Sequence, residues 1–132
     1  MTVPPKARIA VIGAGLMGHG IAQVFALAGH EVRIHDTVMA NLDSATSRIL
    51  ANLRELGEDE STVERVEATP HLAATVRDAD YVVEAVLEDL PLKQKLFADI
   101  EQHAPPLAIF ASNTSVIPIT RIMEKLDRKS VV

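Results

Sequence analysis

Three glycines near the start of the chain have the spacing of a phosphate-binding turn. Gly13, Gly15 and Gly18 follow an apolar run at residues 9–12 and precede a helical pattern that ends at Gly29. The first glycine allows a tight turn, the second lets a phosphate approach the backbone, and the third lets a helix pack closely on the strand. The new helix would direct its unbonded N–H groups and its positive dipole end toward the same place. The pattern predicts a site for the phosphates of a dinucleotide.

An acidic residue follows at the distance that such a site requires. Asp36 stands 18 residues after Gly18, at the end of a second apolar stretch at residues 32–34. A carboxylate there can accept hydrogen bonds from both ribose hydroxyls and repels a 2′-phosphate. Thr37 follows, and no arginine stands at that corner, so we predict NAD rather than NADP as cofactor. The alternative, glycines that serve only a tight turn, does not account for both strands, the helix and the acid being in register.

Two further polar groups follow later apolar segments. Glu88 and Lys93 come after the run at residues 81–86, and Asn113 and Ser115 come after the run at residues 107–111. In a parallel sheet the carboxyl ends of these strands would face the cofactor crevice, where they suit the nicotinamide half and a substrate. Loop and capping residues or surface charges at helical spacing would explain the same residues without a function.

The elements that must position these residues alternate between strand and helix. Strands are predicted at residues 8–12, 31–35, the end of 63–69, 81–86 and 107–111. One helix is predicted directly after the three glycines, and further helices are predicted at residues 41–56, 72–76, 90–103 and 117–126. Strands that alternate with helices imply an α/β fold with a doubly wound parallel sheet. With the nucleotide pattern, the expected strand order is that of a Rossmann fold, 3-2-1-4-5-6, with a truncated sixth strand at residues 130–132.

Apolar spacing predicts which side of each helix faces the sheet. Residues that recur at intervals of three and four form one stripe per helix. The predicted stripes are Ile21, Val24, Phe25 and Ala28 in the first helix, Leu42, Ala45, Ile49, Leu53 and Leu56 in the second, and Leu92, Leu96 and Ile100 in the helix at 90–103.

Composition excludes several classes of protein. The 132 residues suit one domain, and 48% hydrophobic content with only 3% aromatic content predicts a core of Ala, Val, Ile and Leu. A net charge of −5 argues against nucleic acid as a partner, and the lack of cysteine excludes disulfides and thiolate metal sites. No apolar run approaches the length of a membrane span, and residues 1–6 lack the core of a signal peptide. We therefore expect no membrane partner, no bound metal and a cytoplasmic location.

Three segments together resemble the 3-hydroxyacyl-CoA dehydrogenase family. They are IAVIGAGLMGHGIAQVFALAGHEV at residues 9–32, EAVLEDLPLKQKLF at residues 84–97 and ASNTS at residues 111–115. Many dehydrogenases share the glycine motif, but the three segments in this order and spacing are specific to this family. The resemblance spans nearly the whole chain and implies that residues 1–132 form an NAD-binding Rossmann domain.

The resemblance also implies roles for individual residues. The pyrophosphate would be held by the glycine loop, and Asp36 would bind the adenosine ribose. Glu88 and Lys93 match positions that contact NAD near its nicotinamide. Asn113 and Ser115 match the catalytic site, where Ser115 would hydrogen-bond the 3-oxygen of the substrate. The loop positions are Gly13, Gly15, Leu16, Met17 and Gly18.

The chain departs from the family at its end. The general base of the family is a histidine in a His-aromatic-aromatic-Asn-Pro stretch beyond the sixth strand, and the sequence ends at Val132 before such a stretch. We also expect residues 1–132 to lack the all-helical second domain, which makes the family's homodimer and closes the substrate cleft. We therefore expect this chain alone to be inactive. Its five histidines are expected to have ordinary surface or packing roles, with His19 and His30 flanking the first helix.

The substrate remains open between two classes. The full-length enzyme would oxidise the 3-hydroxyl of a 3-hydroxyacyl-CoA in fatty acid metabolism. Residues 41–67 are shorter than the CoA-binding arm of the family, and Ser115-Val116-Ile117-Pro118 departs from the common continuation, so a free 3-hydroxy acid, of the carnitine or gulonate type, is an alternative. A non-catalytic NAD-binding module is a third hypothesis, which Asn113 and Ser115 disfavour because NAD binding alone does not obviously require both.

Overall fold

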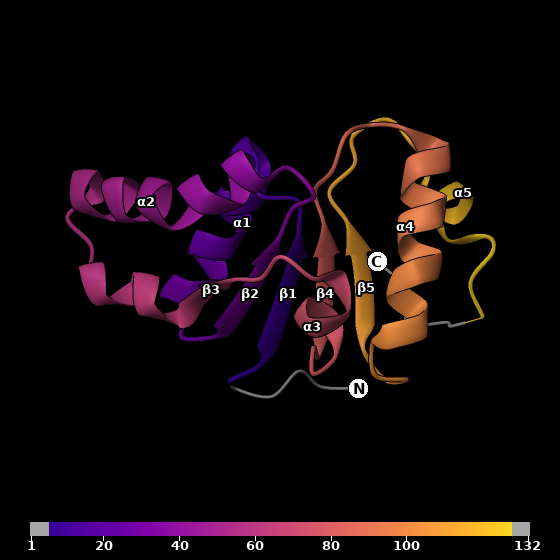
Figure 1. Cartoon of the computed structure of the whole chain (residues 1–132), viewed down its shortest axis with the longest axis horizontal. Helices are drawn as coiled ribbons and strands as arrows, with labels where there is room; N and C mark the ends of the chain where they lie inside the picture. Colours follow the sequence, from indigo (N-terminus) through magenta and orange to yellow (C-terminus); the bar gives the residue numbers. More distant parts are fainter. Residues whose placement is uncertain (1–5, 128–132) are drawn as a thin grey trace.

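A five-stranded parallel sheet forms the centre of the molecule. The computed structural model describes residues 6–127. The strands are β1 (Arg8–Ile12), β2 (Glu31–His35), β3 (Val66–Ala68), β4 (Tyr81–Glu84) and β5 (Ile109–Ser112), in the order β3-β2-β1-β4-β5 (Figure 1). This confirms the predicted doubly wound order for five strands, while the predicted sixth strand at residues 130–132 lies outside the described residues.

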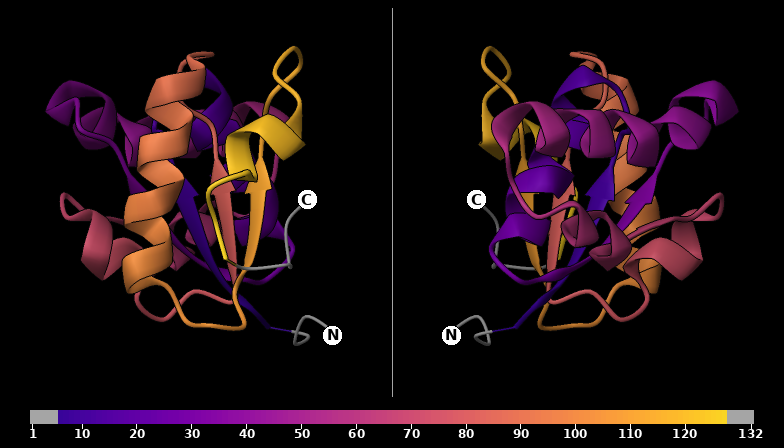
Figure 2. Two further views of the ribbon diagram at one scale, coloured as in Figure 1. Left: turned by 90° about the vertical axis from the view of Figure 1, so that its right-hand side faces the viewer. Right: turned by 90° about the vertical axis from the view of Figure 1, so that its left-hand side faces the viewer.

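Helices cover both faces of the sheet. The helical segments are α1 (Leu16–Leu27), α2 (Met39–Leu56), the 3-10 helix η1 (Glu60–Arg65), α3 (Leu72–Val76), α4 (Leu90–His103) and α5 (Ile119–Met123). The helices α1 and α2 pack on one face, and α3, α4 and α5 pack on the other (Figures 1 and 2). No helix within residues 6–127 is both long and apolar enough to span a membrane.

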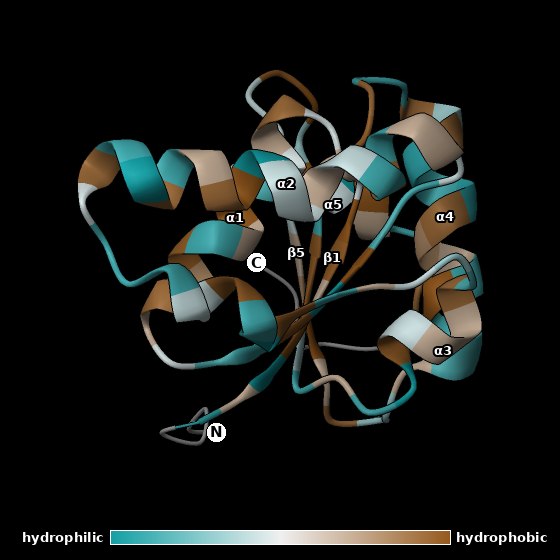
Figure 3. Cartoon of the chain, turned by 60° about the vertical axis from the view of Figure 1, so that its left-hand side comes forward, coloured by the Kyte–Doolittle hydropathy of each residue, from teal (hydrophilic) through white to brown (hydrophobic). Residues whose placement is uncertain are grey.

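Strand β1 supplies both hydrophobic cores because successive side chains of a strand point to opposite faces. Ile9 and Val11 pack with α1 and α2, whereas Ala10 and Ile12 pack with α4 and α5. Figure 3 shows β1 hydrophobic along most of its length. A strand buried on both faces explains the continuous apolar run in the sequence.

The predicted element boundaries are close to the observed ones. The first two strands, the five-residue α3 and the helix at 90–103 agree with prediction, and β3 occupies the end of the segment 63–69. Strand β4 ends at Glu84 rather than at residue 86, and β5 is shifted to Ile109–Ser112. The last described helix is shorter than the predicted 117–126, since α5 covers only Ile119–Met123.

The predicted inward face of α1 is only partly confirmed. Ile21 and Phe25 are half-buried and pack against the core, whereas Val24 is 65% exposed and Ala28 is also exposed. The fully buried positions include Gly18, Ala22 and Ala26. At Gly18 the helix lies so close to the start of the glycine loop that a side chain would collide with the loop backbone. Apolar size therefore predicted the wrong orientation for Val24 and Ala28.

The predicted face of α4 is confirmed for Ile100, and Leu96 is half-buried against the core, but Leu92 is exposed. The buried residues of α4 are Lys93, Phe97 and Ile100, while Leu92 is 43% exposed. In α2 the predicted stripe is confirmed for Leu42, Ala45, Ile49 and Leu53, but Leu56 in the last turn is exposed.

Candidate nucleotide-binding site

Two glycines of the loop lie in close contact with neighbouring backbone, and a third lies at an open position. Gly13 has φ +113°, and a Cβ there would lie 2.5 Å from the carbonyl oxygen of Ala85. A Cβ on Gly18 would lie 1.6 Å from the carbonyl oxygen of Gly13, which fixes how closely α1 approaches the loop. At Gly15 no atom lies within 4 Å of an added Cβ. A ligand can therefore approach the backbone at Gly15 from the open side.

Helix α1 begins at this opening. Gly15 is its N-cap, and its carbonyl accepts the N–H of His19 at 3.0 Å. The N–H groups of the first turn, at Leu16 and Met17, have no partner within the helix. The side chains of these two residues are 79% and 57% exposed. This end of the helix can bind an anion through backbone donors and the helix dipole.

Asp36 lies beside the loop and helps to hold it. Its Oδ2 accepts the N–H of Ala14 at 2.9 Å, and its Oδ1 accepts the N–H of Val38 at 2.8 Å. The amide of Asn41 donates to Oδ2 at 3.3 Å. An ionised carboxylate has about four acceptor positions. Asp36 already accepts three hydrogen bonds, so it can keep these contacts and still accept one hydroxyl group from a ligand.

A largely apolar cavity of about 330 Å³ opens next to Asp36. It lies between the start of α2 and the segment that joins β4 to α4. Leu92, which was predicted to face the core, lines this cavity, and so does Leu96, which also packs against the core. A flat apolar ring fits such a wall. The other lining residues are Ile12, Gly13, His35, Asp36, Thr37, Val38, Asn41, Ala85, Val86 and Leu87.

A buried ion pair lies at the carboxyl ends of β4 and β5. Glu84 and Lys93 both have fully buried side chains, and Lys93 Nζ donates to Glu84 Oε2 at 2.5 Å. The same carboxylate accepts the N–H of Val86 at 2.7 Å and the hydroxyl of Ser112. Lys93 also donates to the carbonyl of Val86 at 3.2 Å. These contacts compensate for the desolvation of both charges and join β4, β5 and α4.

Glu88 lies at the outer side of this pair. Its Oε1 is 3.3 Å from Lys93 Nζ, and its Oε2 accepts the hydroxyl of Thr114 at 2.6 Å. The Thr114 hydrogen bond, and to a lesser extent Lys93, hold the pKa of Glu88 below its usual value against the opposing effect of desolvation. Glu88 is therefore a carboxylate at neutral pH.

Asn113 and Ser115 lie at the same edge of the sheet. The N–H of Asn113 donates to the carbonyl of Glu84 at 2.7 Å, which continues the pairing of β5 with β4. The side chains of Asn113 and Ser115 are exposed. The fold thus gathers all the candidate residues at the carboxyl edge of the sheet, where open α/β sheets bind ligands.

Comparison with known proteins identifies the family. Residues 8–132 match the family described as 3-hydroxyacyl-CoA dehydrogenase, NAD binding domain. The chain belongs to this family. Its cofactor is therefore NAD, in agreement with the prediction from Asp36.

Individual relatives of this NAD-binding domain support the assignment. The chain is 40% identical over 121 residues to a probable 3-hydroxybutyryl-CoA dehydrogenase of Deinococcus radiodurans, covering 87% of this chain and 44% of the relative. It is 37% identical over 131 residues to a glyoxysomal fatty acid beta-oxidation multifunctional protein of Brassica napus, covering 93% of this chain and 18% of the relative. The chain thus spans less than half the length of these relatives.

A solved structure shows the same dehydrogenase fold. The 3-hydroxybutyryl-CoA dehydrogenase of Escherichia coli superimposes with a TM-score of 0.86 at 34% identity, covering 99% of this chain and 29% of that one.

One central residue of this NAD-binding domain is not predicted from the sequence. The apolar run at residues 81–86 predicts a strand but gives no role to Glu84, and the full burial of Lys93 excludes its alternative as a surface charge. A carboxylate in an otherwise apolar strand is the available signal, because a buried charge needs a partner. The lysine lies nine positions further along.

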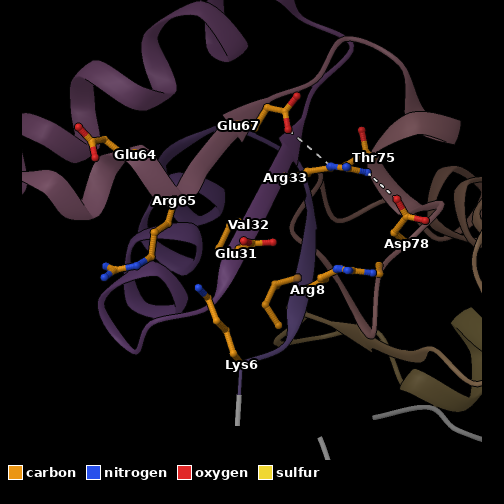
Figure 4. Close-up of a pocket in the computed structure, with 12 residues that line it drawn as sticks. Lys6, Arg8, Glu31, Val32, Arg33, Glu64, Arg65, Glu67, Thr75 and Asp78 are labelled. Carbon is orange, nitrogen blue, oxygen red and sulfur yellow. Dashed lines mark hydrogen bonds and ion pairs between the residues drawn. The ribbon is translucent and has the colours of Figure 1, made fainter. Parts of the chain in front are cut away.

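A larger hollow than the cavity beside Asp36 lies elsewhere. A depression of about 550 Å³ is lined by residues at the amino ends of β1 and β2 and by parts of β3, η1 and α3 (Figure 4). Basic and acidic side chains are mixed there, and Arg33 is paired with Glu67 at 3.6 Å and with Asp78 at 3.5 Å. This hollow is not at the carboxyl edge and contains none of the candidate site residues.

Proposed function

We propose that this chain is the cofactor half of an enzyme that oxidises the 3-hydroxyl of a 3-hydroxyacyl-CoA, such as 3-hydroxybutyryl-CoA. The observation that carries the proposal is the convergence of the glycine loop, Asp36 and the Glu88–Asn113–Ser115 edge in a domain of this family. When bound, NAD would supply the acceptor for a hydride from C3, and the hydroxyl proton would go to a general base, giving a 3-ketoacyl-CoA.

Each side of the crevice would hold one part of the cofactor. The backbone of the glycine loop, from Gly13 to Gly18 with Leu16 and Met17, would bind the pyrophosphate, and Asp36 would accept a hydroxyl of the adenosine ribose. The apolar cavity beside Asp36 has the shape and lining for the adenine ring. The open side of Gly15 and this cavity support the fit of NAD to these residues.

The other end of the crevice would hold the nicotinamide and the substrate. Glu88, oriented by Lys93 and Thr114, would contact the nicotinamide end of the cofactor. Ser115 would hydrogen-bond the 3-oxygen, and Asn113 would orient the same group. Proton removal requires a base within hydrogen-bond distance of the hydroxyl. We propose that a histidine outside this chain supplies it, so the chain alone binds NAD but does not turn over.

Two measurements on the 132-residue chain test this proposal. Calorimetric titration should show saturable one-to-one binding of NAD, and incubation with 3-hydroxybutyryl-CoA and NAD should produce no NADH. A folded sample that does not bind NAD would contradict the proposed site. Turnover at the rate of a complete dehydrogenase would contradict the proposed division of roles.

Identifying the substrate class requires activity measurements on the full-length protein. Comparing 3-hydroxybutyryl-CoA with free 3-hydroxy acids would decide between a CoA ester and a carnitine- or gulonate-type acid. A Ser115→Ala variant should lower kcat while leaving NAD affinity unchanged, and an unchanged kcat would favour a non-catalytic NAD module. A homodimer and a cytoplasmic location are predictions for the full-length protein. The Brassica relative is named as glyoxysomal and does not support the cytoplasmic location.

A further inference from the structure

A buried histidine lies directly behind the glycine loop. His19 was expected to flank α1, but it lies within the first turns of that helix and is only 6% exposed. Its Nδ1 is 2.9 Å from the carbonyl oxygen of Gly15, the N-cap of α1. Its Nε2 is 3.3 Å from Nδ2 of Asn52 in α2. The imidazole thus connects the phosphate-binding end of α1 with the neighbouring helix.

The partners of His19 define where its proton lies. A carbonyl oxygen only accepts hydrogen bonds, so Nδ1 carries the proton and Nε2 is the acceptor. The amide of Asn52 has two N–H groups: one donates to His19 Nε2, and the other donates to Gln23 Oε1 at 3.1 Å. One arrangement of hydrogens therefore satisfies the whole network.

The network fixes one peptide plane of the loop. The Gly15 carbonyl accepts both the backbone N–H of His19 at 3.0 Å and the imidazole at 2.9 Å. In a trans peptide unit the carbonyl and the following N–H point in opposite directions. Holding the Gly15 carbonyl toward the helix therefore holds the Leu16 N–H in the opposite direction, away from the body of the helix.

We propose that His19, held by Asn52, is a positioning residue for the cofactor pyrophosphate. It acts through the peptide between Gly15 and Leu16, and glycine at the N-cap makes this support necessary because its backbone is the least restricted. The inference rests on the NAD site proposed above. It predicts that the histidine contributes to binding of the phosphates and not to binding of the adenosine end.

The test compares ligands that contain or lack the pyrophosphate. His19→Ala should weaken binding of NAD and ADP-ribose about three- to tenfold, the effect of one hydrogen bond, and leave adenosine binding unchanged. His19→Asn should restore most of the affinity, because its amide N–H can occupy the place of Nδ1–H. His30→Ala is the matched control, since His30 accepts the Ala7 N–H at 2.9 Å but does not contact the loop. It should leave NAD binding unchanged.

The outcomes separate the two proposals. A folded wild-type chain that does not bind NAD would overturn the proposed function. Wild-type binding with no change in His19→Ala, or an equal loss for adenosine and ADP-ribose, would overturn the positioning role. If His19→Ala does not fold, His19→Asn and Asn52→Ala replace it in the test. Asn52→Ala should weaken the binding of ADP-ribose but not the binding of adenosine. Equal losses of affinity for both ligands would contradict the inference.

Discussion

At the scale of single residues, the site depends on charged groups that satisfy one another. Glu84 and Lys93 are both fully buried, and each would carry a large desolvation cost without the other. Glu84 also accepts a hydrogen bond from the hydroxyl of Ser112 in β5, and Ser112 directly precedes Asn113. The ion pair therefore positions the polar edge on which the proposed substrate contacts depend.

Removing one member of this pair should destabilise the fold. Lys93→Met leaves the Glu84 carboxylate buried and unpaired, and the free energy of unfolding should fall by about 3–5 kcal/mol. Lys95→Met on the exposed side of the same helix is the control and should change it by about 0.5 kcal/mol or less. Urea unfolding of the three proteins measures the difference. Equal stability of the two variants would show that the pair is not a structural requirement.

The ionisation of Glu88 should depend on Thr114. Because the hydroxyl of Thr114 is the main cause of the lowered pKa, Thr114→Val should raise the pKa of Glu88 toward its usual value. With its pKa lowered by folding, Glu88 adds stability above its unfolded-state pKa, and this is lost as the pH falls through its folded-state pKa. The variant should lose that contribution. Carboxyl-carbon NMR titration would measure the shift, and an unchanged pKa would contradict the assigned cause.

At the scale of elements, the contact between α1 and the glycine loop decides how the helix points at its ligand. Gly18 faces the Gly13 carbonyl so closely that a side chain at this position would force the helix away from the loop. This contact therefore fixes how closely the N-terminal end of α1 approaches the phosphate-binding loop.

A methyl group at this contact should disrupt both the helix and the site. Gly18→Ala places a Cβ 1.6 Å from a backbone oxygen, so the backbone must shift, at a cost of about 1–3 kcal/mol, and NAD binding should be lost. Gly20→Ala lies two residues away in α1 with open space around it, and it should stabilise the helix by up to about 1 kcal/mol. Thermal unfolding and calorimetry measure both effects. NAD affinity retained in Gly18→Ala would refute the close-packing argument.

At the scale of the whole molecule, the two sides of the crevice come from different parts of the chain. The phosphate side comes from β1, α1 and β2, whereas the Glu88 side comes from β4, α4 and β5. Each side packs on its own hydrophobic core, and β1 belongs to both. A ligand that bridges the crevice would add contacts across this shared strand.

Binding of NAD should therefore stabilise the whole chain. At a concentration one hundred times its Kd, a ligand that binds only the folded state adds about 2.7 kcal/mol. Differential scanning calorimetry should show a rise in Tm with NAD and a smaller rise with an equal concentration of NADP, because Asp36 would repel the 2′-phosphate. A larger rise with NADP would contradict the role given to Asp36.

The sequence by itself determined the order of strands and helices, the parallel sheet and the phosphate loop. These features depend on local signals: apolar runs, glycine spacing and an acid at a set distance along the chain. The glycines and Asp36 are close in sequence, and their geometry follows from one strand–helix–strand unit. Local patterns therefore located this half of the site.

The inward-facing sides of α1 and α4 could be read only from the tertiary structure. The same is true of the polar side chains that bond to one another. Ser112 and Glu84 are 28 residues apart, and Asn52 and His19 are 33 residues apart. Nothing in the spacing of either pair predicts a contact, because the contact exists only after the sheet has brought separate elements together. Lys93 and His19 are fixed in the site because both are buried, and a polar group removed from water needs a hydrogen-bond or ionic partner.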